Sequence, residues 1–146
     1  MNETFDHEAE EVILANEKFY LAVNRADMDL MSDVWLGGPD DKCVHPGWPM
    51  LYGWEAIKES WKNIFGEGGP ETVEISQVSV EVAEGLAWVV CVEKVIHRAG
   101  DDDMRIGFAQ STNVFHKTGS GWKLVVHHAS PIPMPRTEAV SDTNLQ

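Results

Sequence analysis

The chain has 146 residues, a length that usually forms one domain and buries about two thirds of the surface of the unfolded chain. With 43% hydrophobic and 24% charged residues, the composition is that of a globular protein and excludes disorder along most of the chain. The formal net charge of -13 makes nucleic acid and anionic membrane surfaces poor partners, because such a field repels phosphate groups.

The first part of the chain is predicted to be helical. Apolar residues recur at helical spacing over 7–25, which predicts an amphipathic helix. Asp27 can cap a second, shorter helix that ends at the Gly-Gly-Pro segment 37–39. A short strand is predicted over 42–45, and the loop 47–53 that follows is irregular and apolar, which indicates that it covers something.

A third helix and then a sheet are predicted for the remainder. The helix covers 54–65, where apolar and charged residues occupy opposite faces. Beyond Pro70 the apolar period changes to two, which predicts long antiparallel strands. These strands cover 73–82, 86–97, 104–117 and 122–130. Three prolines end the last strand, and the polar segment 137–146 is expected to be a flexible tail.

This order of elements predicts an α+β fold. We expect three N-terminal helices to pack on one face of a strongly curved antiparallel sheet, as a cone with an internal pocket. Inward side chains from several strands would meet at the open end of the cone, where a small molecule can bind. We expect one domain over 1–136 and a flexible polar tail over 137–146.

Membrane insertion and disulfide formation are not expected. The longest apolar run, 86–92, is far shorter than the roughly 20 residues that a bilayer requires. The start of the chain is acidic where a signal peptide would be basic, so we expect a cytoplasmic protein. Cys43 and Cys91 show neither a CxxC motif nor a Cys/His pair at metal-site spacing, which indicates two reduced, buried thiols.

Four short strings carry a resemblance to a known family. They are NRADMD at 24–29, VHP at 44–46, GWEAI at 53–57 and GWKLVVHHAS at 121–130. In this order they resemble the SnoaL-like branch of the nuclear transport factor 2 (NTF2-like) superfamily, to which ketosteroid isomerase is related. The family includes isomerases, dehydratases, polyketide cyclases and association domains of kinases, so the resemblance implies the cone fold rather than one reaction.

The resemblance to ketosteroid isomerase also implies candidate catalytic residues. The general base of the isomerase immediately precedes a proline, and His45 before Pro46 holds that place. The oxyanion donor lies six residues before the glycine of the last hairpin, which corresponds to Asn113. The tyrosine donor of the first helix corresponds to Phe19, which has no hydroxyl, and Tyr20 is expected to point elsewhere.

His45 and Asn113 have side chains that suit these roles. An imidazole with the unperturbed pKa of about 6.5 can take a proton at neutral pH. Amide hydrogens can polarise a carbonyl as negative charge develops on its oxygen. Each residue has a structural interpretation as well, because His45 could be a core histidine and Asn113 could connect two strands.

Further side chains are candidates for ligand binding. They are Phe19, Trp48, Trp61, Glu93 and His128. Trp48 could cover an apolar ligand, whereas Trp61 has the helical spacing of a core residue. Glu93 lies in a very apolar strand and needs a partner or a raised pKa, unless it is a surface residue paired with a base. Because His127 and His128 point to opposite faces, strand alternation favours His128 as the inward one unless a bulge intervenes.

Neither a metal nor another cofactor is predicted. His45, Glu93 and His128 have the ligand types of a two-histidine, one-carboxylate centre. No two of them share a short motif, however, and such distant trios arise by chance.

We therefore expect a homodimer that binds a small apolar molecule carrying a carbonyl or acid group. If the protein is an enzyme, His45 is the base, Asn113 the donor, and His128 or Glu93 an orienting partner. The reaction would then be proton abstraction in an isomerase, dehydratase or cyclase of unassigned substrate. The alternative is a non-catalytic association module, in which the outer face of the sheet pairs two or more copies.

Overall fold

The computed structural model describes residues 3–67, 71–98 and 103–133. Its helices are α1 (Glu3–Arg25), α2 (Met28–Val34) and α3 (Trp54–Glu67). Its strands are β1 (Lys42–Val44), β2 (Leu51–Tyr52), β3 (Glu71–Ala83), β4 (Leu86–Arg98), β5 (Met104–Thr118) and β6 (Gly121–Ile132). The predicted polar tail, 137–146, lies outside the described residues.

The strands form one six-stranded sheet in the order β2-β1-β6-β5-β4-β3. The long strands β3 to β6 pair antiparallel with their sequence neighbours, as predicted. The pairing of β1 with β6 is parallel, so the sheet is mixed. This α+β arrangement of three helices on a curved sheet confirms the predicted fold class.

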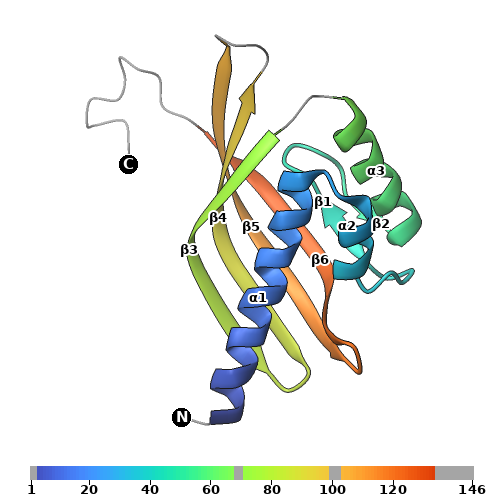
Figure 1. Ribbon diagram of the computed structural model, residues 1–146, viewed down its shortest axis with the longest axis vertical. Helices are drawn as coiled ribbons and strands as arrows, with labels where there is room; N and C mark the ends of the chain where they lie inside the picture. The colour runs from blue at the N-terminus through green and yellow to red at the C-terminus, as the bar shows by residue number, and fades with distance from the viewer. Residues whose placement is uncertain (1–2, 68–70, 99–102, 134–146) are drawn as a thin grey trace.

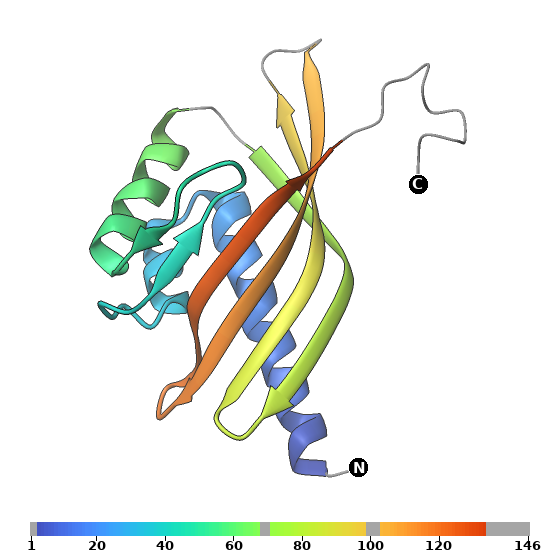
Figure 2. The same ribbon diagram turned by 180° about the vertical axis from the view of Figure 1, so that it is seen from behind.

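The helices cover one face of the sheet. The helix α1 crosses the concave face of β3 to β6, while α2 and α3 lie beside β1 and β2 at one side (Figure 1). In the view from behind, β3 to β6 stand in front of α1, and no described helix covers their outer face (Figure 2). Of the described helices, none combines the length and the apolar character needed to cross a membrane.

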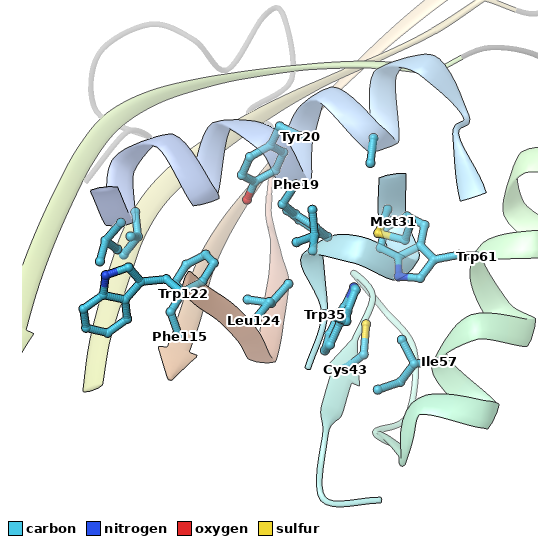
Figure 3. Close-up of a cluster of buried hydrophobic side chains, with 14 of the residues drawn as sticks. Phe19, Tyr20, Met31, Trp35, Cys43, Ile57, Trp61, Phe115, Trp122 and Leu124 are labelled. Atoms are coloured by element: carbon cyan, nitrogen blue, oxygen red, sulfur yellow. The ribbon is translucent and has the colours of Figure 1, made fainter. Parts of the chain in front are cut away.

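Aromatic residues fill the core where the helices meet the sheet. Phe19 of α1 is fully buried, and its ring meets the rings of Trp35 and Trp61 edge-on at centroid distances of 6.4 and 5.8 Å. Figure 3 shows this cluster between α1, α3 and the sheet. Such edge-to-face contacts favour a fixed arrangement of the rings. Large apolar residues at helical spacing on α1 and α3 place Phe19 and Trp61 at this contact.

One extra residue in β6 reverses its side-chain alternation. Val114 pairs with Val126 and Phe115 pairs with Leu124, which leaves Val125 as a β-bulge. Trp122 and Leu124 are buried before the bulge, and the buried positions after it are 127 and 129. The bulge therefore decides which histidine of β6 faces the interior.

A side-chain amide joins the end of α1 to β3. The Asn24 Nδ2 donates to the Val73 carbonyl at 3.0 Å, and the Val73 N–H donates to the Asn24 Oδ1 at 2.7 Å. This pair replaces a strand neighbour that β3 lacks at the edge of the sheet.

Substituting Asn24→Ala should therefore lower the free energy of unfolding by about 1–3 kcal/mol, because two backbone groups of Val73 lose their partner. Urea unfolding would measure the change. The matched substitution Asn63→Ala on the exposed side of α3 should change it by less than about 0.5 kcal/mol. Equal effects of the two substitutions would contradict this account.

Candidate functional site

A cavity of about 330 Å³ opens between the concave face of the sheet, α1, α3 and the loop after β1. This volume is in the range of small-molecule sites. Most of the wall is apolar, with aromatic rings from Phe19, Trp48, Trp61 and Phe108. The polar side chains that line it are Tyr20, His45, Glu93 and His127. Among the described residues that line the cavity, none is a lysine or an arginine.

Five of the seven predicted site residues lie at this cavity. They are Phe19, His45, Trp48, Trp61 and Glu93. His45 is buried at the end of β1, with the rings of Trp48 and Trp61 each 4.7 Å from it between centroids. The arrangement places the imidazole between a ring of the loop after β1 and a ring of α3.

His128 does not lie at the cavity, and the expectation that it points inward was wrong. Its side chain is exposed on the outer face of the sheet, in a shallow groove with Val90 and Gln110. The bulge at Val125 is the physical reason, because it inserts one residue between Leu124 and the positions that follow. His127 is the inward histidine, with 3% of its surface exposed.

Tyr20 was expected to point away from the site, and this expectation was also wrong. Tyr20 lines the cavity next to Phe19, and both are buried. Figure 3 shows both rings on the side of α1 that faces the core. Because α1 lies in the trough of a curved sheet, its buried face is wide enough to include neighbouring positions.

The Tyr20 hydroxyl lies at the centre of a buried hydrogen-bond network. It donates to the Glu93 Oε2 at 2.6 Å and lies 2.9 Å from the Ser111 Oγ. It also accepts from the Asn113 Nδ2 at 3.1 Å. The network thus connects α1 with β4 and β5 through side chains whose polar atoms are shielded from water.

Asn113 is fully buried and does not line the cavity, so it is not placed to donate to a substrate carbonyl as expected. Its Nδ2 donates to the Asn16 Oδ1 at 2.9 Å as well as to Tyr20. Its Oδ1 lies 2.6 Å from the His127 Nδ1. Because the amide hydrogens are used within the protein, Asn113 acts as a positioning residue for Tyr20 and His127.

Hydrogen bonding assigns opposite tautomers to the two buried histidines. The Asn113 Oδ1 can only accept, so the His127 Nδ1 carries the proton and Nε2 has the free lone pair. The Ser60 hydroxyl donates to the Ile57 carbonyl at 2.7 Å, so its oxygen accepts from the His45 Nε2 at 2.9 Å. In His45, therefore, Nδ1 carries the lone pair, and the Cys43 Sγ lies 4.0 Å from this atom.

Burial sets the charges of these groups. Burial and the nearby His127 lower the pKa of His45 to about 3. Burial and His128 lower the pKa of His127 to about 3. Burial raises the pKa of Glu93, against the hydrogen bonds from Tyr20 and Ser111. The His127 Nε2 and the Glu93 Oε2 are 4.0 Å apart, and the low pKa of His127 keeps its imidazole neutral, so the contact is not an ion pair.

Within residues 3–67, 71–98 and 103–133, no three His, Cys, Asp or Glu side chains are grouped so that they could hold a metal ion. The trio of His45, Glu93 and His128 is divided between the two faces of the sheet. Cys43 and Cys91 are free and buried, which confirms the prediction of two reduced thiols.

Sequence reasoning missed four side chains that shape the site. They are Tyr20, Ser60, Ser111 and His127. Ser111 shares strand parity with Asn113 and Ala109, so alternation alone could have placed it inward. No comparable signal marks Val125 as a bulge, and the inward position of His127 depends on that bulge.

Comparison with known sequences supports a family assignment. The sequence pattern of the SnoaL-like domain matches residues 12–135. The F-box protein SKIP8 of Arabidopsis thaliana is 24% identical over 119 residues, which cover 82% of this chain. The chain spans about half (48%) of the length of that curated relative.

Solved structures of the NTF2-like family have the same fold. A candidate dehydratase of that family from Streptomyces avermitilis is 31% identical with a TM-score of 0.83, over 89% of this chain and 99% of that one. A candidate calcium/calmodulin-dependent protein kinase type II association domain from Thiobacillus denitrificans is 28% identical with a TM-score of 0.72, over 82% and 93%. A candidate scytalone dehydratase from Novosphingobium aromaticivorans, 16% identical with a TM-score of 0.79 over 91% and 89%, shows the fold alone.

The raised pKa of Glu93 predicts a pH-dependent effect of Glu93→Gln on stability. The folded protein holds the Glu93 proton more tightly than the unfolded chain, so the wild type loses stability as pH rises through the folded pKa. Between the pKa of Glu93 in the unfolded chain and its pKa in the folded protein, the unfolding free energy should shift in favour of the variant by about 1.4 kcal/mol per pH unit.

Urea unfolding at a series of values between about pH 5 and about pH 9 would measure this shift. The matched substitution Glu81→Gln, at an exposed position of β3, serves as the control. A difference between Glu93→Gln and the wild type that stays constant with pH would contradict the assignment.

Proposed function

The chain belongs to the SnoaL-like domain family of NTF2-like proteins, and we propose that it is a dehydratase acting on a small, uncharged hydroxycarbonyl compound. The observation that carries this proposal is one cavity lined by a neutral imidazole, His45, and by the Glu93 carboxyl group, whose pKa is raised by burial. Environments that push two pKa values apart in this way mark an acid and a base.

The cavity wall supports an uncharged substrate. No lysine or arginine is among its described lining residues, and the chain as a whole carries a net charge of -13. A carboxylate in this cavity would lack a cation and would pay a large desolvation penalty. Of the two expected ligand types, the carbonyl compound therefore fits the wall, and the acid does not.

The proposed step is an elimination that needs no cofactor. The unprotonated Nδ1 of His45 removes a proton from the carbon next to the carbonyl, and the C–H electron pair forms a carbon–carbon double bond. The bond from the neighbouring carbon to its hydroxyl oxygen breaks, and the Glu93 carboxyl protonates that oxygen, so that water leaves. Proton return from the His45 imidazolium to the Glu93 carboxylate, through water, completes the cycle.

The low pKa of His45 restricts the substrate further. An imidazole with a pKa of about 3 is neutral at physiological pH, but it is a weak base. It can therefore act only on a C–H group that a carbonyl has made acidic, with simultaneous protonation of the leaving group. Ser60 supports this role, because its oxygen holds the Nε2 proton and leaves Nδ1 as the accepting atom.

Relatives favour dehydration over isomerisation and cyclisation. The Streptomyces avermitilis protein, which is 31% identical over 89% of this chain, is a candidate dehydratase.

The cytoplasmic location expected from the acidic start of the chain stays a prediction.

Turnover of β-hydroxyketones would test the proposal. Compounds that raise the melting temperature of the wild type identify ligands, and absorbance of the conjugated enone product measures elimination. We expect His45→Gln to lower kcat by about 10²–10⁴-fold, because proton transfer by a positioned base is lost. The exposed substitution His116→Gln should leave kcat unchanged. Full turnover by His45→Gln, or no elimination from any bound β-hydroxyketone, would refute the proposal.

Self-association is a second candidate function, compatible with the first. The outer face of β4 to β6 is uncovered (Figure 2) and presents uncharged residues at its centre, although the chain has 24 acidic residues. These residues are Trp88, Val90, Val92, Thr112, Val114 and Val126. The Thiobacillus denitrificans relative, 28% identical over 82% of this chain, is a candidate kinase association domain. We propose that two copies of this chain pair through this face.

Val90→Asp should weaken that association, because Val90 is 42% exposed in one copy and would place a charge within the apolar contact. Sedimentation velocity should show a dimer for the wild type and a monomer for the variant. Leu14→Asp on the exposed side of α1 is the matched control and should remain dimeric. A monomeric wild type would exclude this candidate.

A further inference from the structure

We infer that Glu93 and His127 form a subsite for a hydroxyl group in the cavity wall, with Glu93 as its donor and the His127 Nε2 as its acceptor. The inference deepens the proposed function and rests on it for the use of this cavity by a ligand. It specifies that the substrate places a hydroxyl group against these two residues. It also assigns a specificity role to His127.

The acceptor is an imidazole nitrogen with an unused lone pair. The His127 Nδ1 donates to the Asn113 Oδ1 at 2.6 Å, which leaves Nε2 unprotonated. His127 lines the cavity, although only 3% of its surface is exposed. The polar atom recorded near Nε2 is the Glu93 Oε2, at 4.0 Å, which is too long for a hydrogen bond. A buried acceptor with a free lone pair calls for a donor from a ligand or a water molecule.

The donor is the carboxyl group of Glu93, oriented by Tyr20. The Tyr20 oxygen already accepts from the Asn113 Nδ2, and its own proton is donated to the Glu93 Oε2 at 2.6 Å. Because Oε2 accepts this hydrogen bond, we place the carboxyl proton on Oε1. Glu93 lines the cavity and is 4% exposed, so this proton is available to a bound molecule and shielded from bulk water.

A hydroxyl group is the ligand that satisfies both partners. It accepts the Glu93 proton and donates its own proton to the His127 Nε2, across a gap that the two residues do not close themselves. A ketone oxygen has no proton for Nε2, and an ammonium group has no lone pair for the carboxyl proton. The subsite therefore selects an alcohol or phenol, and it places the hydroxyl beside the acid that the proposed elimination requires.

Phenol and toluene form a matched probe pair, because a methyl group replaces the hydroxyl at nearly equal size. NMR titration of the wild type should give a dissociation constant for phenol at least about tenfold below that for toluene, since the unpaired polar groups disfavour toluene. In His127→Leu the preference should fall below about threefold, because the acceptor is absent. The exposed substitution His116→Gln should keep the wild-type ratio.

Glu93→Gln separates this inference from the proposed dehydratase. The glutamine amide can still accept from Tyr20 and donate to a hydroxyl, but it cannot release a proton. The variant should therefore keep the preference for phenol and lose turnover. Preference for phenol without elimination by the wild type would overturn the dehydratase and leave the subsite intact. Elimination without preference for phenol would overturn the subsite alone.

Nitrogen-15 NMR of the wild-type imidazoles tests the subsite even if His127→Leu does not fold. The His127 Nε2 should have the resonance of an unprotonated nitrogen in the free protein. Phenol should move this resonance toward the hydrogen-bonded position, and toluene should leave it in place. A protonated Nε2, or equal shifts with both probes, would refute the inference.

Discussion

The buried hydroxyl of Tyr20 connects the long helix to the sheet and determines the chemistry of the cavity. Without it, the Glu93 carboxyl would lose the donor 2.6 Å away, and the Asn113 amide would lose one of its acceptors. Burial alone penalises a charged carboxylate, while the donors around it moderate this penalty. Because the side chains of the network are hydrogen-bonded to one another, the network specifies one arrangement of α1 on the sheet.

Two separate sets of hydrogen bonds orient the two buried histidines of the cavity. Two histidines with equally depressed pKa values present different unprotonated atoms, since Ser60 accepts the Nε2 proton of His45 and Asn113 accepts the Nδ1 proton of His127. The tautomers, rather than the charges, decide which atom can accept a proton. The apolar wall keeps these groups away from bulk water, so their hydrogen bonds are not lost to solvent.

The two faces of the sheet differ in the side chains that they present. The concave face, covered by α1, contains the cavity and its polar side chains, whereas the outer face presents apolar residues and His128 (Figures 1 and 2). Strand alternation allows this, because neighbouring residues serve opposite faces. A family that includes both candidate dehydratases and candidate kinase association domains is consistent with such a division.

The sequence by itself determined the helices, the long strands, the fold class and five of the fifteen described residues that line the cavity, including His45 and Glu93. These depend on local periodicity and on short strings, which are readable one segment at a time. Only the tertiary structure decided that His127 faces inward, because one bulged residue reverses strand parity without a local signal. Only it decided the roles of Tyr20 and Asn113, because a hydrogen bond between residues far apart in the chain exists only after folding brings them together.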